Sequence, residues 1–132
     1  MAIGSRALPG SDIRVRQSRP REWMGKAFNL LARLLVLEGY SDTQCGFKAF
    51  RRAAAMDLFS RLRTPGFAFD VEILVLCREL GYLVVEVPVV WSDVKPSRVR
   101  LLGGSWGMLK DLLRIRRLAR SWRRARTPSE ND

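Results

Sequence analysis

The chain has 132 residues, 47% of them hydrophobic and 28% charged, which suits one globular domain with a real core and excludes a disordered protein. Its 24 Lys and Arg residues outnumber 13 Asp and Glu residues, and the formal charge of +11 favours partners that carry phosphate, such as nucleic acid, anionic lipid or a nucleotide sugar. The lack of histidine excludes imidazole catalysis and histidine-bound metal. Two cysteines without zinc spacing predict no disulfide framework, and no apolar run reaches the roughly 18 residues of a membrane span.

The first part of the chain predicts a strand end, a basic loop and a long helix. Residues 2–6 are typical of a strand that runs into a loop, and residues 7–22 are polar and rich in arginine. That loop is either a solvated arm or a phosphate clamp, because guanidinium groups match phosphate oxygens in pairs. Residues 22–38 are apolar on nearly every side, which predicts a helix in the core or, less favoured, against lipid. Gly39 is expected to cap its C-terminal end.

The following stretch, residues 41–50, gathers an acid, an amide, a thiol, a glycine and a lysine. The alternation from Phe47 to Phe50 predicts a short strand. Gly46 is expected either to adopt a positive φ or to let another group approach closely. An ordinary loop that feeds a buried strand explains the same residues, and both interpretations stay open at this point.

Two shorter helices and a strand are predicted next. Residues 52–62 and 70–80 have helical spacing, and a Thr-Pro-Gly turn separates them. Asp70 is expected to cap the second helix or to lie in its first turn, and Glu72 to pair with a cation, with a structural role favoured over catalysis for both. Residues 82–91 predict a strand buried on both faces, with Pro88 at an edge or a bulge.

The C-terminal part predicts a basic loop over residues 92–100, a helix over 103–124 and a disordered tail over 127–132. The helix is predicted to be amphipathic, with apolar residues on one face and cations on the opposite arc. The apolar face comprises Met108, Leu112, Ile115, Ala119 and Trp122, and the basic arc comprises Lys110, Arg114, Arg117, Arg120 and Arg124. Such a helix suits an anionic membrane, nucleic-acid phosphates, or a core with a solvated basic face. The predicted units are residues 1–102, 103–126 and 127–132.

One string carries a family resemblance. Asp42-Thr43-Gln44-Cys45-Gly46-Phe47-Lys48 resembles the signature of family 2 glycosyltransferases that act on polyprenyl phosphates, above all the dolichyl-phosphate β-glucosyltransferase type. Four further stretches resemble the same family in the same order. They are residues 3–6, residues 29–35, residues 67–72, and residues 86–91 with 97–100.

The resemblance implies an α/β fold, the C-terminal half of a GT-A-like domain, with about three strands in an incomplete sheet and four helices. Full-length members carry a nucleotide-binding half before this point, with an Asp-x-Asp motif for Mg or Mn. This sequence has no Asp-x-Asp and no Gly-rich phosphate loop, so those metal ligands are absent from it. The resemblance therefore implies an acceptor-side portion: a truncated reading frame, a relic or half of a split enzyme.

The resemblance also implies roles for individual residues. Asp42 is expected to be the carboxylate at the reaction centre, where it orients the acceptor or stabilises the sugar's developing positive charge. Cations and polar groups around it are expected to bind phosphate. These are Arg6, Arg21, Gln44, Lys48, Ser97, Arg98 and Arg100. Asp70 and Glu72 are implied to lie near the floor of the site, and Gly25 stands where mannosyltransferase relatives have a serine.

The expected function is transfer of a hexose from a nucleotide sugar to a polyprenyl (dolichyl) phosphate. The isolated chain is expected to be inactive without the donor half, and to lie at the cytoplasmic face of a membrane as a peripheral protein. The alternative is a basic binding module for RNA or an anionic membrane surface, which acts through arginine and tryptophan.

Overall fold

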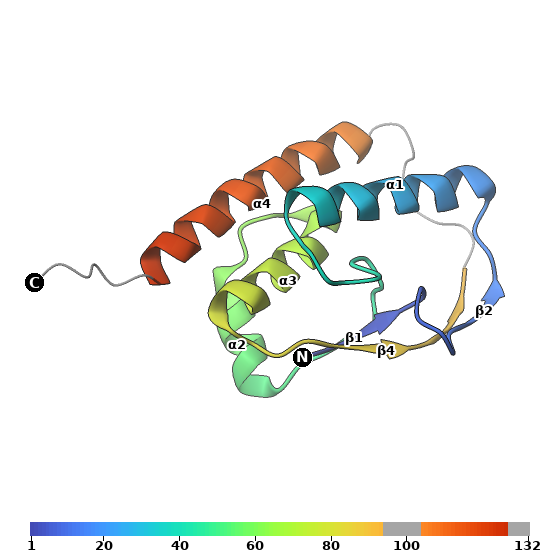
Figure 1. Cartoon of the computed structure of the whole chain (residues 1–132), viewed down its shortest axis with the longest axis horizontal. Helices are drawn as coiled ribbons and strands as arrows, with labels where there is room; N and C mark the ends of the chain where they lie inside the picture. Colours follow the sequence, from blue (N-terminus) through green and yellow to red (C-terminus); the bar gives the residue numbers. More distant parts are fainter. Residues whose placement is uncertain (94–103, 127–132) are drawn as a thin grey trace, which may run out of the picture.

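The computed structural model describes residues 1–93 and 104–126, which form an α/β structure. Its strands are β1 (Ala2–Ser5), β2 (Asp12–Val15), β3 (Lys48–Ala49), β4 (Val85–Pro88) and β5 (Val90–Ser92). Its helices are α1 (Arg19–Leu35), α2 (Arg52–Arg61), α3 (Phe69–Leu80) and α4 (Gly104–Arg126), with a short 3₁₀ helix η1 (Gly66–Ala68). Figure 1 shows α1 and α3 on one side of the strands, with α4 beyond them as an outer layer.

The strands form two small sheets. In the first, β1 lies between β3 and β4 and pairs antiparallel with β3 and parallel with β4, so that Ile3 is opposite both Lys48 and Glu86. In the second, β2 and β5 pair in parallel. Gly4 in β1 allows two side chains to pass very close, because a Cβ there would lie 2.7 Å from Cγ1 of Val89, between β4 and β5, and 3.0 Å from Sγ of Cys45, in the segment after α1.

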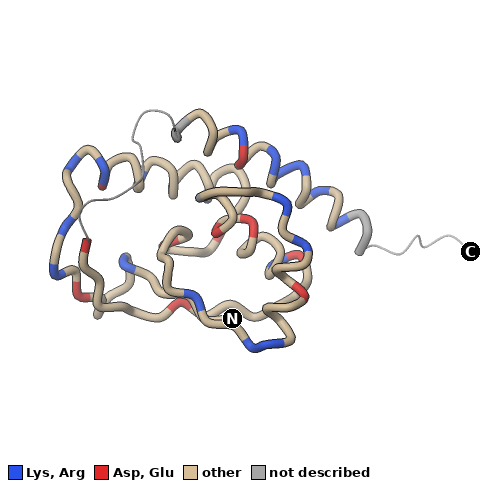
Figure 2. The backbone as a smooth tube through the Cα atoms, turned by 180° about the vertical axis from the view of Figure 1, so that it is seen from behind, with Lys and Arg blue, Asp and Glu red and all other residues tan. Residues whose placement is uncertain are grey.

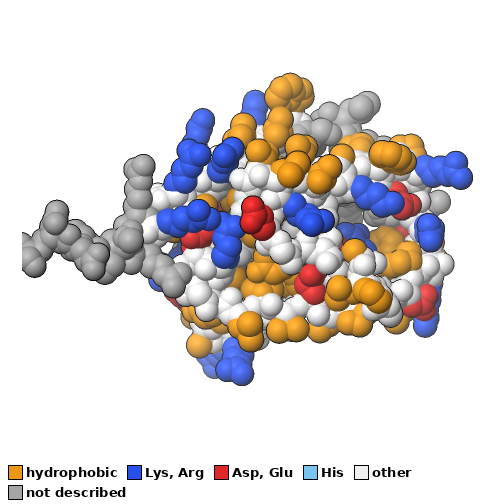
Figure 3. Space-filling model, viewed as in Figure 1, with side chains coloured by type: hydrophobic (Ala, Val, Ile, Leu, Met, Phe, Trp, Pro, Cys, Tyr) orange, Lys and Arg blue, Asp and Glu red, His pale blue; other side chains and the backbone are white. Residues whose placement is uncertain are grey.

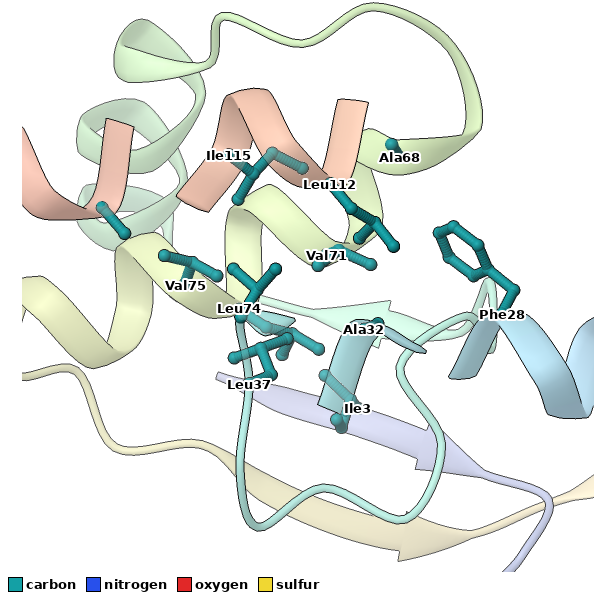
Figure 4. Close-up of a cluster of buried hydrophobic side chains, with 12 residues drawn as sticks. Ile3, Phe28, Ala32, Leu37, Ala68, Val71, Leu74, Val75, Leu112 and Ile115 are labelled. Carbon is teal, nitrogen blue, oxygen red and sulfur yellow. The ribbon is translucent and has the colours of Figure 1, made fainter. Parts of the chain in front are cut away.

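Helix α3 is the centre of the core and is buried on both sides. One side packs against α1, α4 and β1 in a cluster drawn in Figure 4. That cluster contains Ile3, Phe28, Ala32, Val36, Leu37, Ala68, Val71, Leu74, Val75, Leu112, Ile115 and Ala119. The other side of α3 packs against α2 through Leu58, Ile73, Leu76 and Cys77. Burial on two sides explains why α3 is apolar around nearly its whole circumference.

Helix α1 differs from the prediction. It begins at Arg19, with a proline in its first turn, and ends at Leu35, so the expected Gly39 cap is wrong and Val36 caps the helix instead. The expectation that this helix is core is correct for only one stripe, because Phe28 and Ala32 are buried while Trp23 and Leu34 are 76% and 74% exposed. The rest of the molecule covers one side of α1, and that side alone is buried.

Three other local expectations fail. The basic loop over residues 7–22 contains β2 and the start of α1. The strand over 82–91 is split into β4 and β5 and is largely exposed, because the two halves pair with different strands at the edges of small sheets. Gly46 has no positive φ and nothing within 4 Å of a Cβ built on it, so neither expected reason for that glycine applies. Pro88 does lie in an edge strand, as predicted.

Helices α2 and α3 agree with their predicted bounds. Both lie within a residue of those bounds, and Gly81 ends α3 in the left-handed region with φ +79°. Helix α4 buries Leu112, Ile115 and Ala119, and Arg114, Arg116, Arg117, Arg120 and Arg123 are exposed. In the part of the chain that the structure describes, every helix is too short or too polar to cross a membrane. The predicted tail over 127–132 and most of the loop over 92–100 lie outside the described residues.

Candidate functional site

A cleft of about 410 Å³ opens where the end of β1, the N-terminal half of α1 and the segment after α1 meet. Both charged and apolar side chains line it. The lining residues include Arg6, Ile13, Arg16, Glu22, Gly25, Lys26, Asn29, Asp42, Gln44 and Trp91. Because these residues come from five separate segments, the cleft exists only in the folded chain.

The cleft is centred on a bidentate ion pair between Arg6 and Asp42. Arg6 Nε donates to Asp42 Oδ2 at 2.6 Å, and Arg6 Nη2 donates to Oδ1 at 2.9 Å. The Arg6 backbone N–H adds a bond of 3.1 Å to Oδ2, and the Gln44 N–H adds one of 3.1 Å to Oδ1. Four donors therefore hold one carboxylate, and paired guanidinium bonds of this kind are among the strongest in proteins.

These contacts fix the charge state of the pair. Burial alone would raise the pKa of Asp42, but the hydrogen bonds and positive charge of Arg6, with the two backbone N–H groups, outweigh burial and hold this pKa below its usual value. The Asp42 bond in turn raises the pKa of Arg6. Asp42 is thus ionised at neutral pH and is a poor proton acceptor. Its evident role is to orient the Arg6 guanidinium.

The segment that carries Asp42 is held from both sides. Asn29 of α1 donates to the Ser41 carbonyl at 3.0 Å and accepts from the Thr43 N–H and hydroxyl at 3.2 and 2.8 Å. Glu86 of β4 accepts from the Ser41 N–H at 3.0 Å and from the Asp42 N–H at 3.1 Å. Side chains from a helix and a strand therefore replace the regular hydrogen bonds that this loop lacks, which makes the position of Asp42 well defined.

Positive charge faces the rest of the cleft. The Arg6 guanidinium lies over the Trp91 ring at 5.4 Å, a cation–π contact that steadies it from the β5 side. Arg16 is exposed at the cleft wall, and Lys26 pairs with Glu22 at 2.7 Å. An exposed arginine beside an oriented, partly accessible guanidinium is an arrangement that can bind an anion such as phosphate.

A second ion pair lies deeper. Lys48 Nζ is 2.7 Å from Asp70 Oδ1 and donates to the Cys45 carbonyl at 2.7 Å. Only 6% of the Lys48 side chain is exposed. Burial raises the pKa of Asp70, the Lys48 bond lowers it, and the nearby Asp42 charge raises it further, with a net increase. This inner pair joins β3 to the first turn of α3 and is not open to a ligand.

Comparison with curated proteins points to one family. The dolichyl-phosphate β-glucosyltransferase of Saccharomyces cerevisiae is 38% identical over 88% of this chain, and that of Dictyostelium discoideum is 39% identical over 88%. The human dolichyl-phosphate β-glucosyltransferase is 35% identical over 99% of the chain. These matches support a family 2 glycosyltransferase of the dolichyl-phosphate β-glucosyltransferase type, with this chain corresponding to a part of it. No protein-family model matches it, and no solved structure matches it.

The chain spans between 35% and 41% of the length of these three relatives. Within it, the string that resembles the family signature runs directly through the cleft and the inner ion pair. Of the residues expected at the site, the structure brings Arg6, Asp42 and Gln44 together.

The other predicted site residues lie elsewhere or outside the described chain. Lys48 does not line the cleft, because its ammonium group is committed to Asp70. Glu72 is fully buried and accepts from the Arg63 and Thr64 N–H groups at 2.8 and 2.6 Å, so the predicted pairing with a cation is wrong and its role is to hold the turn before η1. Arg21 lies in the first turn of α1 and is not among the residues that line the cleft. Ser97, Arg98 and Arg100 fall outside the described residues.

Sequence reasoning did not assign a site role to four polar or aromatic residues that shape the site, although one of them, Arg16, lies in the loop predicted to be a solvated arm or a phosphate clamp. Arg16 and Trp91 line the cleft, and Asn29 and Glu86 position its loop. A signal for three of them was present, because Asn29, Glu86 and Trp91 all lie in stretches that resemble the family. Asn29 and Glu86 are also polar residues within apolar runs, a pattern that calls for a buried partner.

The described residues do not fit a divalent metal. No group of three or more carboxylates and thiols within residues 1–93 and 104–126 could hold one. Both oxygens of Asp42 already accept hydrogen bonds from Arg6 and Gln44.

Proposed function

We propose that this chain supplies the acceptor side of a glycosyltransferase that transfers a hexose from a nucleotide sugar to a polyprenyl (dolichyl) phosphate. The observation that carries the proposal is the Arg6–Asp42 ion pair in a cleft that is lined in part by residues 42–48, the stretch that resembles the family signature. The names of the relatives support the choice of reaction. Transfer itself is proposed for a protein of the relatives' length, with this chain binding the acceptor.

In the proposed reaction an oxygen of the acceptor phosphate attacks the anomeric carbon of the sugar. A new carbon–oxygen bond forms, the bond to the nucleotide diphosphate breaks, and the diphosphate leaves with the electron pair. The phosphate is already ionised and needs no strong base, which agrees with an Asp42 whose pKa is held low by Arg6. Asp42 then acts as a positioning residue that aims Arg6 at the phosphate. Cations that are already held in place lower the entropic cost of orienting the acceptor phosphate for attack.

Arg16 and Lys26 are proposed to complete the phosphate site. Both line the cleft, and Arg16 is exposed there. Gln44 lies beside Asp42 and can donate an amide hydrogen to the same phosphate or to a sugar hydroxyl. Asn29 and Glu86 act indirectly, because their hydrogen bonds fix the loop that carries Asp42.

The finer architecture and the setting are also proposals. The four helices and partial mixed sheet suit the acceptor half of a GT-A-like domain. The exposed apolar stripe of α1, which includes Trp23, Leu30 and Leu34, suits a peripheral position on the cytoplasmic face of a membrane, where a lipid-linked acceptor would be found. A divalent metal is proposed for the complete enzyme alone. The nucleotide-sugar donor would bind with a second half of that enzyme.

Titration of the 132-residue chain with farnesyl phosphate, a soluble polyprenyl phosphate, tests the acceptor site by calorimetry. Farnesyl phosphate is expected to bind, and farnesol, which has the same chain without the phosphate, to bind far more weakly. Arg16→Gln should weaken farnesyl phosphate about tenfold, since a hydrogen bond to a charged group contributes roughly 1.5–3 kcal/mol. The matched control is Arg14→Gln, because Arg14 is exposed, pairs with Asp12 and does not line the cleft.

Equal binding of farnesol and farnesyl phosphate would overturn the phosphate site, and so would equal losses in the two variants. The isolated chain is expected to bind the acceptor without transferring sugar. Measured turnover of a nucleotide sugar by the purified chain would overturn that part of the proposal.

A further inference from the structure

A second hollow, of about 370 Å³, lies between the C-terminal end of α1 and the middle of α4. Five arginines line it: Arg33, Arg78, Arg116, Arg120 and Arg123. Glu38 is the acidic residue among the lining side chains, and the buried Glu79 lies just beneath. Positive charge is thus far more concentrated here than in the Arg6–Asp42 cleft, whose lining includes two carboxylates beside three cations.

Internal contacts account for only part of this charge. Arg78 donates to the Val36 carbonyl at 2.8 Å, where it satisfies the end of α1, and to Glu79 at 2.7 Å. Arg123 also reaches Glu79, at 2.9 Å. Arg33, Arg116 and Arg120 are exposed and form no salt bridge with another described residue. Their three guanidinium groups remain available to an anion, over a floor that Arg78 and Glu79 hold in place.

An exposed apolar stripe of α1 borders the hollow and meets its lining at Leu34. Leu34 is 74% exposed, and Leu30 one turn earlier on α1 is 54% exposed. Trp23 continues the same stripe towards the start of the helix, since it lies seven residues, or about two helical turns, before Leu30. Figure 3 shows blue side chains gathered over the outer part of α4 with hydrophobic side chains beside them, and Figure 2 traces basic residues along α4.

We propose that this arginine pocket binds the phosphate of an anionic phospholipid headgroup, with the lipid's acyl chains lying along the Leu34–Leu30 stripe. The commitment to lipid comes from the arrangement of the pocket. A free phosphate or a nucleic acid needs the cations alone, whereas here the cations border a helix stripe with large exposed leucines and a tryptophan. The proposal does not depend on acceptor binding in the Arg6–Asp42 cleft.

Vesicle co-sedimentation of the full chain tests the pocket. The probes are phosphatidylcholine vesicles with and without a minority of phosphatidic acid. The double variant Arg116→Gln/Arg120→Gln should lose binding to the anionic vesicles about 30-fold, since each cation at an anionic surface is worth about fivefold, or roughly 1 kcal/mol. Both residues are exposed, so the variant keeps its fold, which circular dichroism checks.

The matched control removes the same charge from the same helix. Arg114 and Arg117 are exposed on α4 but do not line the pocket. Arg114→Gln/Arg117→Gln should lose less than about fivefold, because charges more than roughly 10 Å from the headgroups are screened. Equal losses in the two double variants would show diffuse attraction and overturn the pocket.

Two further arms identify the source of the phosphate. Leu34→Asn should weaken vesicle binding while leaving any binding of inorganic pyrophosphate unchanged. Two results would overturn the lipid assignment. In the first, pyrophosphate displaces the chain from vesicles at matched phosphate concentration. In the second, the Arg116 and Arg120 changes weaken RNA binding and leave vesicle binding unchanged. The Arg116→Gln/Arg120→Gln variant should still bind farnesyl phosphate. The experiments can therefore reject the lipid pocket without rejecting the acceptor site, and the reverse.

Discussion

Two carboxylates with little exposed surface, the buried Asp42 and the partly buried Asp70, each face a cation in this molecule, and their pKa values move in opposite directions. Asp42 accepts four hydrogen bonds, two of them from the Arg6 side chain, and its pKa is lowered. Asp70 faces one ammonium group, that of Lys48, and burial together with the Asp42 charge raises its pKa. The number of donors, more than the presence of a cation, decides whether a buried carboxylate is stabilised in its charged form.

The two pairs also differ in what can reach them. The Arg6 side chain is 29% exposed at the cleft, whereas the Lys48 side chain is 6% exposed. The outer pair can meet a ligand and the inner pair supports the loop and strand beneath it. The stretch that resembles the family signature, residues 42–48, therefore divides into a part that lines the cleft and a part that supports the fold.

The largest effect is expected from Asp42→Asn, which removes the charge that four donors surround. We expect about 2–4 kcal/mol lower stability at pH 7, because Arg6 would be left half-buried without its counter-charge. The folded pKa of Asp42 lies below its unfolded value, so this contribution is present above the unfolded pKa and is lost as pH falls through the folded pKa. Urea unfolding of both proteins at pH 7 and in acid measures it. An undiminished difference in acid would contradict the assigned low pKa.

An intermediate effect is expected from Lys48→Met, which keeps the volume and removes the cation beside Asp70. We expect roughly 1–3 kcal/mol lower stability at pH 7. Because the folded pKa of Asp70 is already raised, the penalty for its charge is present above that pKa and disappears as Asp70 takes up a proton. The loss should therefore shrink from pH 7 towards the usual pKa of aspartate, about 3.9.

A carbon-13 titration of the Asp70 carboxyl follows the same change directly and should show a further rise of its pKa in the variant. The control is Lys26→Met, since the Lys26–Glu22 pair is exposed and should change stability by about 0.5 kcal/mol or less. If the Lys48 variant is no less stable than this control at pH 7, the inner pair has no structural role.

The smallest effect is expected from Gly25→Ser in α1. A Cβ at Gly25 meets no atom within 4 Å, and serine has a higher helix propensity than glycine. We expect about 0.5 kcal/mol greater stability, seen as a higher midpoint of thermal unfolding, with one hydroxyl added to the cleft lining. A lower midpoint would show that the cleft wall cannot accept a side chain.

Local patterns in the sequence predicted much of the fold. Helices α2 and α3 are bounded by residues whose backbone preferences end helices, such as Gly81, so their bounds are readable from the sequence. Strand β2 was missed because its four residues lie in a basic stretch and are stabilised by pairing with β5, far along the chain. The exposed stripe of α1 was missed because an apolar helix does not reveal which of its sides the rest of the chain will cover.

The candidate site divides in the same way. The resemblance identified Arg6 and Asp42, which do meet. It did not separate Lys48 from the cleft, because the alternation of a short strand gives the side on which a lysine lies but not the carboxylate that it meets there. The contacts of Glu86 and Trp91 depend on β1 and β4 lying in parallel and on β5 diverging from them, which are properties of the whole fold.

The most direct test of the account locates farnesyl phosphate on the chain by nitrogen-15 NMR. The central claim predicts that the largest shifts on titration occur at the Arg6 Nε–H and at the backbone N–H groups of residues 41–44. Saturable binding that leaves the Arg6 Nε–H unmoved, with shifts at other arginines instead, would contradict the claim that this ion pair meets the acceptor phosphate.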